Sequence, residues 1–282
     1  MLPLRDENPH PPGFKPKLTI ALIIMNVIVF GIEVAITGQF IEFSNREAMN
    51  MFLTWGAVPG CVTGQIDGVN TGMGIVNCPA IPELTLITST FMHGGIMHLG
   101  GNMLFLWIFG DNIEAKFGRV KYIGIYLMWG VGAGLIHIYG DAGSGIPAVG
   151  ASGAIAGILG AYLVMFPRAK VMTFVMLGFF WRMMHIPAKF FLPFWLIFQN
   201  LLPFFIGGFG VAGGGVAFLA HIGGFFLGLG VGYFYKKTNR SDYTYGSRYG
   251  YRDDFRLFNL LNFHSYNYNY AIRTRITISW TF

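Results

Sequence analysis

Residues 150–166 read GASGAIAGILGAYLVMF, which places Ser152 among glycines and alanines at the start of an apolar segment. Small residues with an occasional serine are the usual means by which membrane helices pack closely together. A serine in such surroundings can also be a nucleophile, because small neighbours let a substrate and a base approach its hydroxyl. The stretch therefore predicts a closely packed membrane helix, and it leaves two roles open for Ser152.

The composition of the whole chain favours a membrane protein. Of its 282 residues, 54% are hydrophobic and 11% are charged, and the mean hydropathy is +0.53. A soluble domain carries roughly a quarter of charged residues. We predict an all-α polytopic membrane protein with a six-transmembrane-helix bundle, with spans near 18–37, 95–113, 120–139, 151–166, 190–207 and 215–235.

The charges on the connecting loops predict the orientation of the bundle. Lysines and arginines precede the first span, lie between spans two and three and between spans four and five, and follow span six. The opposite loops hold Arg46 as their one basic residue, together with acidic residues. By the positive-inside rule both termini are cytoplasmic, and we expect an integral protein of a bacterial inner membrane. Topology thus accounts for the net charge of +6 without a nucleic-acid partner.

We divide the chain into a cytoplasmic N-terminal arm (1–17), a six-helix domain (18–236) and a cytoplasmic C-terminal tail (237–282). The tail is rich in Tyr, Asn and Arg and has no helical period, so disorder and a short β-prone segment both fit it. The apolar stretch 168–189, which is interrupted by basic residues and a histidine, is expected to be an interfacial connector.

The first external loop, near residues 38–94, contains both cysteines of the chain, Cys61 and Cys78. In an oxidising compartment the two could form a disulfide worth about 3 kcal/mol. Two free thiols fit the sequence equally well.

Four polar residues of the predicted spans share one depth in the membrane. Spans two, four and six run in the same direction, and His98, Asn102, Ser152 and His221 all lie near the starts of these spans. Polar residues inside a membrane are costly and are therefore candidates for function. His98 and Asn102 are four residues apart, so they share one helix face.

Two stripes of small residues predict how spans four and six pack. In span six, Ala220, Gly224, Gly228 and Gly232 recur every four residues, and span four offers Gly153, Gly157 and Ala161. Such stripes allow two helix backbones to approach closely. We therefore expect the hydroxyl of Ser152 to reach an imidazole nitrogen of His221.

This pair suits acyl transfer. A hydroxyl becomes a strong nucleophile when a base such as histidine removes its proton. The amide of Asn102, a ring N–H of His98 and the first backbone N–H groups of span four can stabilise an oxyanion. No carboxylate lies at this depth in spans two, four or six, so the sequence predicts a Ser–His dyad.

Four motifs accompany these residues: His98-x3-Asn102 with His93 upstream, Gly150-x-Ser152-Gly153, Ala220-His221-x2-Gly224, and Gly110-x3-Glu114-x3-Gly118. In these motifs, their order and their placement on the spans, the chain resembles the bacterial rhomboid intramembrane serine proteases. The resemblance extends over about residues 18–236. One departure lies in the first external loop, where Thr54-Trp55-Gly56 stands in place of the Trp-Arg pair of some family members.

The resemblance implies that Ser152 is the nucleophile and His221 the general base, with an oxyanion hole formed by Asn102, His98 and the Ser152 backbone N–H. It places His93 near a water-bearing site and makes Glu114 a structural hydrogen-bonding residue. It also implies that the substrates are transmembrane helices cut near their outer ends, and that no metal or cofactor is needed.

Other interpretations remain beside this one. A chaperone-like role that binds membrane helices without cleaving them is the alternative function. Gln199 in span five is expected either to line a lateral opening for substrate or to pack between helices. The glycine-rich loop 206–215 is expected to act as a flexible cap. The sequence gives no indication of an oligomeric state.

Overall fold

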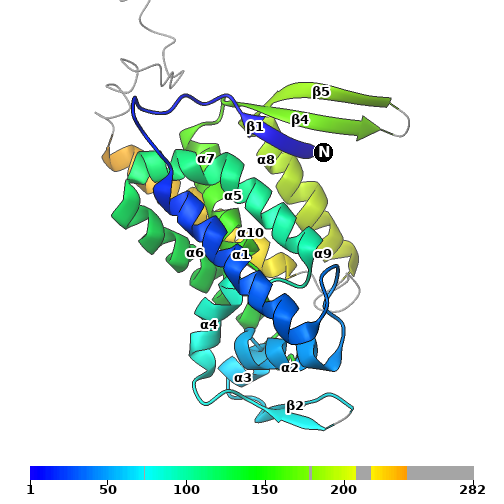
Figure 1. Cartoon of the computed structure of the whole chain (residues 1–282). Coiled ribbons are helices and arrows are strands. Elements are labelled where there is room, and N and C mark those ends of the chain that lie inside the picture. Colours follow the sequence, from blue (N-terminus) through cyan, green and yellow to red (C-terminus); the bar gives the residue numbers. More distant parts are fainter. Residues whose placement is uncertain (73, 178–179, 208–216, 240–282) are drawn as a thin grey trace, which may run out of the picture.

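The computed structural model describes residues 1–72, 74–177, 180–207 and 217–239, which form a helical bundle with a loop-rich layer at one end and a small sheet at the other (Figure 1). The tail beyond residue 239 and most of the expected glycine-rich cap lie outside these residues. The long helices are α1 (Lys17–Thr37), α5 (Ile96–Phe117), α6 (Arg119–Gly140), α7 (Ser152–Met165) and α10 (Phe218–Thr238). A further helix consists of α8 (Ala188–Leu196), the π-helical turn η3 (Ile197–Leu201) and α9 (Leu202–Gly207).

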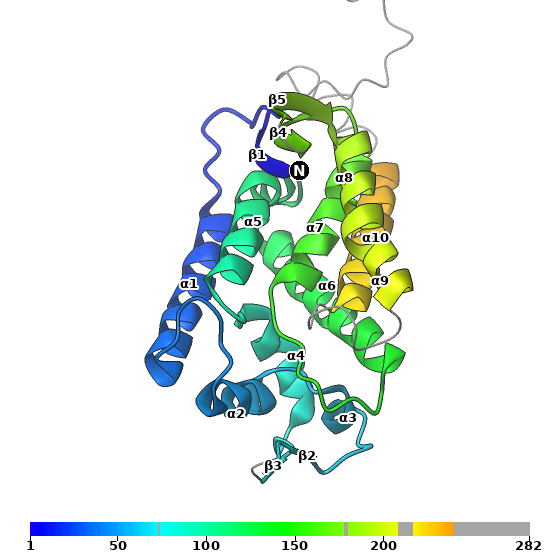
Figure 2. The ribbon, with the colours of Figure 1, turned by 90° about the vertical axis from the view of Figure 1, so that its right-hand side faces the viewer.

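Each predicted span corresponds to a helix, but the helices differ in their fitness to cross a membrane. Within the described residues, four helices are long and apolar enough: α1, α6, Ala188–Ile206 and α10. Helix α5 carries Asp111, Glu114 and Lys116 in its last two turns. Helix α7 has 14 residues, about 21 Å, and lies in the middle of the bundle (Figure 2). Most of its side chains are buried. Six crossings therefore remain a prediction.

The small-residue stripes of α7 and α10 pack against each other as the sequence predicts. A Cβ added at Gly228 would lie 1.8 Å from the carbonyl oxygen of Gly157, and one at Gly160 would lie 2.0 Å from that of Phe225. No side chain can occupy such a gap, so the two backbones are in direct contact. This contact sets the distance between the N-terminal ends of the two helices.

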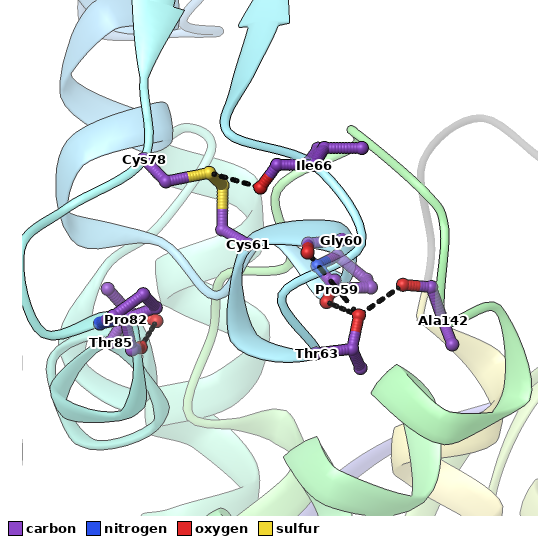
Figure 3. Close-up of a disulfide and its surroundings, with 9 residues drawn as sticks. All are labelled: Pro59, Gly60, Cys61, Thr63, Ile66, Cys78, Pro82, Thr85 and Ala142. Carbon is purple, nitrogen blue, oxygen red and sulfur yellow. Dashed lines mark hydrogen bonds between the residues drawn. A yellow bond between two sulfur atoms is a disulfide. The ribbon is translucent and has the colours of Figure 1, made fainter.

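The segment between α1 and α5 forms the loop-rich layer. It contains α2 (Arg46–Trp55), α3 (Pro59–Val62), β2 (Gly68–Asn70), β3 (Ile75–Asn77), η1 (Pro82–Leu84), α4 (Thr85–Thr88) and η2 (Ser89–Phe91). A disulfide joins Cys61 to Cys78, whose Cα atoms are 5.5 Å apart (Figure 3). Of the two alternatives that the sequence leaves open, the structure therefore has the disulfide.

The disulfide-bearing segment holds the connection from α6 to α7. The hydroxyl of Thr63 donates to the carbonyl of Ala142 at 2.7 Å (Figure 3), and the backbone N–H of Gly60 donates to the carbonyl of Ser144 at 2.8 Å. An isolated antiparallel bridge joins Ala57 to Ala148. These bonds restrain the chain just before α7 begins.

An antiparallel sheet at the opposite end departs from the all-α prediction. Its order is β1–β4–β5, formed by β1 (Leu2–Asp6), β4 (Lys170–Leu177) and β5 (Phe180–Pro187). The expected interfacial connector is thus a hairpin, and the N-terminal arm is its third strand. The alternation of a strand explains the difference, because Val171 and Thr173 are buried while Met176 is exposed.

Asp6 connects this sheet to the helices. Its carboxylate accepts hydrogen bonds from the Tyr162 hydroxyl at 2.5 Å and from Asn112 Nδ2 at 3.0 Å. Burial raises the pKa of Asp6 to about 6. The N-terminal arm is therefore attached to α5 and α7 at the end opposite the disulfide.

Candidate functional site

Ser152 and His221 meet where α7 and α10 begin. Ser152 is the first residue of α7, and His221 lies in the first turn of α10. The distance between Ser152 Oγ and His221 Nε2 is 2.6 Å, although 69 positions separate the two residues in the chain. The contact expected from the shared depth and the small-residue stripes is present.

Glycines allow the backbone to approach the site closely. A Cβ at Gly224 would lie 2.2 Å from the carbonyl oxygen of Gly153, so the turns that carry His221 and Ser152 approach through bare backbone. Gly150 has a φ of +130°, which residues with a side chain rarely adopt, and a Cβ there would lie 2.9 Å from the ring of His98. Three of the predicted supporting residues, Gly150, Gly153 and Gly224, thus contact the site through their backbones.

His98 faces the same region as Ser152. Its Nδ1 accepts the backbone N–H of Gly94 at 3.3 Å, so a neutral ring carries its proton on Nε2. A Cβ at Gly150 would lie 2.9 Å from this Nε2 and 3.5 Å from Ser152 Oγ. A ring N–H donor and the serine hydroxyl therefore flank one side of Gly150.

Asn102 lies one helix turn after His98 on α5. It is 8% exposed, and its Nδ2 is buried without a hydrogen-bond partner among the described residues. A buried donor left unpaired costs about 1–3 kcal/mol. Asn102 therefore holds an unused donor one helix turn from His98.

His93 is fully buried beside His98, and the two ring centroids are 5.1 Å apart. Neither ring nitrogen of His93 has a hydrogen-bond partner among the described residues. The backbone N–H of His93 donates to Glu33 Oε1 of α1 at 3.1 Å, which ties the segment before α5 to the first helix. The position agrees with the predicted polar group near the site.

Glu114 lies at the other end of α5 and does not join the site. Its carboxylate accepts the Thr19 backbone N–H at 2.8 Å, the Thr19 hydroxyl at 2.9 Å and the Leu18 backbone N–H at 3.1 Å. The two N–H groups belong to the first turn of α1, where a carboxylate compensates unpaired donors and the helix dipole. The predicted structural role of Glu114 is consistent with these bonds.

Asn200 is a neighbour of His221 that the sequence analysis missed. Its Oδ1 is 2.7 Å from His221 Nδ1, and its Nδ2 donates to the carbonyl of Trp195 at 3.2 Å. Asn200 is buried, with 1% of its surface exposed, whereas Gln199 lies at the surface. Of the two roles expected for Gln199, packing between helices is therefore wrong. A signal was available, because Leu192, Leu196 and Asn200 recur every four residues and so share one helix face.

Four helices of the described residues are long and apolar enough to cross a membrane, which defines an integral membrane protein. One of them, α10, carries His221, which is hydrogen-bonded to Ser152 of the shorter helix α7. Residues 83–238 match the Rhomboid domain, and this match covers more than half of the chain. The chain belongs to the rhomboid family.

Several curated proteins are similar to parts of this chain. Rhomboid protein 1, mitochondrial, of Saccharomyces cerevisiae is 28% identical over 160 residues, which are 55% of this chain and 43% of that protein. RHOMBOID-like protein 5 of Arabidopsis thaliana is 38% identical over 78 residues, 28% of this chain and 25% of that protein. Presenilin-associated rhomboid-like protein, mitochondrial, of Homo sapiens is 32% identical over 88 residues, 30% of this chain and 23% of that protein.

These matches span less than half the length of each of these relatives. Two of the three relatives carry the word mitochondrial in their names. The relatives thus support an integral membrane protein of the rhomboid family, but they do not support the expected bacterial type, a bacterial inner membrane or the expected cytoplasmic termini.

Proposed function

We propose that the protein is an intramembrane serine endopeptidase that cleaves transmembrane helices through Ser152 and His221. The observation that carries the proposal is the 2.6 Å contact between Ser152 Oγ and His221 Nε2. A base at this distance can take the hydroxyl proton while the oxygen attacks a carbonyl carbon. Membership of the rhomboid family supports this reaction class.

The proposed reaction has two halves. Ser152 Oγ forms a bond to the scissile carbonyl carbon as its proton passes to His221 Nε2, and the carbonyl oxygen becomes an oxyanion. His221 then returns the proton to the amide nitrogen as the C–N bond breaks, which leaves an acyl-enzyme. Water, deprotonated by His221, hydrolyses this ester and restores the Ser152 hydroxyl.

Three donors are available for the oxyanion. The Ser152 backbone N–H belongs to the first turn of α7 and has no acceptor within that helix. Asn102 Nδ2, which has no partner among the described residues, and the Nε2–H of His98 complete the set. Donors that already point into the site stabilise developing charge without reorganisation.

We place the cleavage near the membrane face that carries the disulfide. Ser152 begins α7 at the end of the bundle near the loop-rich layer, whereas the N-terminal strand lies at the opposite end (Figure 2). Disulfides persist in oxidising compartments. The site would therefore act near an oxidising compartment, on substrate helices that enter from the bilayer.

The test uses purified protein in proteoliposomes with a model transmembrane substrate. Wild type should cleave it, Ser152→Ala and His221→Ala should be inactive, and Ser44→Ala in the exposed part of the loop should match wild type. A fluorophosphonate should label Ser152, as located by mass spectrometry. Cleavage that persists in purified Ser152→Ala would exclude the proposal, and binding of the helix by wild type without cleavage or labelling would favour the chaperone-like alternative.

A further inference from the structure

The second ring nitrogen of His221 has its own partner, on the helix formed by α8, η3 and α9. Asn200 Oδ1 lies 2.7 Å from His221 Nδ1, and Ser152 Oγ lies 2.6 Å from Nε2. The imidazole is thus held from both sides by residues of two different helices. We propose that Asn200 is the positioning residue of His221, which makes the site a Ser–His–Asn arrangement. This inference rests on the proposed function.

The hydrogen-bond directions follow from the chemistry of the groups. To accept the serine proton, a neutral His221 must leave Nε2 bare and carry its hydrogen on Nδ1. That N–H needs an acceptor, and the amide oxygen of Asn200 is one. The amide cannot easily turn its NH2 group toward His221, because Nδ2 already donates to the Trp195 carbonyl at 3.2 Å. The bond to Trp195 therefore selects the tautomer in which His221 can act as a base.

The local backbone brings Asn200 to this place. It lies in the π-helical turn η3 (Ile197–Leu201), between Pro193 in α8 and Pro203 in α9. Single π-turns occur often at functional sites because they change which side chain faces inward. Asn200 is the one residue of η3 that is buried, and it continues the inward row that Leu192 and Leu196 begin.

A neutral amide suits this position within a membrane protein. A carboxylate would bind the imidazolium more strongly, but an ionised group within the bilayer is costly while His221 is neutral. An amide oxygen still accepts the Nδ1–H in both protonation states of the ring. Asn200 would therefore orient the base and stabilise its protonated form without adding a charge.

The closing experiment measures the rate of fluorophosphonate labelling of Ser152 against pH, together with kcat and KM for the model substrate. Asn200→Leu has a similar shape but offers no acceptor, so we expect a roughly 10- to 100-fold fall in kcat and in labelling rate, with KM changed little. The acid limb of the labelling profile should move to lower pH by about one unit, because the imidazolium loses its acceptor.

Asn200→Asp should restore most of the rate, since a carboxyl oxygen accepts the Nδ1–H whether or not the group is ionised. The control is the same substitution at an exposed asparagine of α2, Asn50→Leu, which should match wild type. A folded Asn200→Leu variant with the rate and acid limb of wild type would overturn the role of Asn200 alone. So would equal losses in the Leu and Asp variants, which would indicate a packing role. Absence of labelling in wild type would overturn the proposed function and this inference together.

Discussion

Replacing Gly224 with alanine should separate His221 from Ser152. The new Cβ would lie 2.2 Å from the carbonyl oxygen of Gly153 and 3.3 Å from Cβ of Ala156. A carbon–oxygen contact needs roughly 3.3 Å, so α7 and α10 must move apart by about 1 Å at this level. The obstacle is backbone, which no rotation of a side chain can relieve.

The displacement acts almost directly on the reacting pair. Gly224 follows His221 by one helical turn, and Gly153 is the residue after Ser152. Opening the 2.6 Å contact by about 1 Å takes it beyond hydrogen-bond distance. A misplacement of this size costs roughly 100-fold in rate, and the overpacking should lower the free energy of unfolding by about 1–3 kcal/mol.

The assay is the second-order rate of fluorophosphonate labelling of Ser152 in detergent, with thermal unfolding measured on the same sample. Gly230→Ala, on the same helix, is the matched control. An added Cβ at Gly230 would meet no heavy atom of a neighbouring described residue within 4 Å. The control should label as wild type does and unfold at an equal or slightly higher temperature, because alanine favours a helix more than glycine does. A folded Gly224→Ala variant that labels at the wild-type rate would refute the reasoning that backbone contact sets the Ser152–His221 distance.

Three further predictions address other parts of the molecule. Asn102→Ala should lower kcat by roughly ten- to a thousandfold if its Nδ2 binds the oxyanion, and an unchanged kcat would make Asn102 a packing residue. Changing Cys61 and Cys78 together to serine should lower the free energy of unfolding by about 3 kcal/mol, given the separation of 17 positions, and a melting temperature equal to that of oxidised wild type would contradict this. Burial raises the pKa of Asp6 from 3.8 to about 6, so the folded protein binds this proton more tightly than the unfolded chain, and stability should fall as the pH rises from 4 to 6. Asp6→Asn should flatten that decline in melting temperature, and a slope equal to wild type would remove Asp6 as its cause.

The features that the sequence predicted well are those with a helical period. Ser152 and His221 were placed together by the direction of the spans and by glycines repeated every four residues, and both arguments depend only on the geometry of α-helices. The same geometry put His98 and Asn102 on one face of α5. The close approach of Gly228 to the Gly157 carbonyl is the packing consequence of that repeat.

The sheet was missed because its strands resemble a membrane-surface segment in composition. The stretch 168–189 mixes large apolar residues with basic ones, which fits an interfacial helix as well as a hairpin. What distinguishes the two is the partner strand Leu2–Asp6, which lies more than 160 positions away and pairs with β4. Strand pairing at that separation leaves no local pattern in the sequence.

Asn200 was missed because the helical period alone does not fix which face of the α8–α9 helix is buried. Gln199 and Asn200 are adjacent polar residues in one apolar helix, so hydropathy treats them alike. They lie on different faces of the helix. The four-residue spacing from Leu192 and Leu196 puts Asn200 on the buried face, but two prolines and a π-helical turn interrupt the regular period, so the sequence alone does not fix which face is buried. The position of Ser152 follows from α7, α10 and the loop held by the disulfide. The orientation of His221 also depends on Asn200, and so on the local shape of the α8–α9 helix.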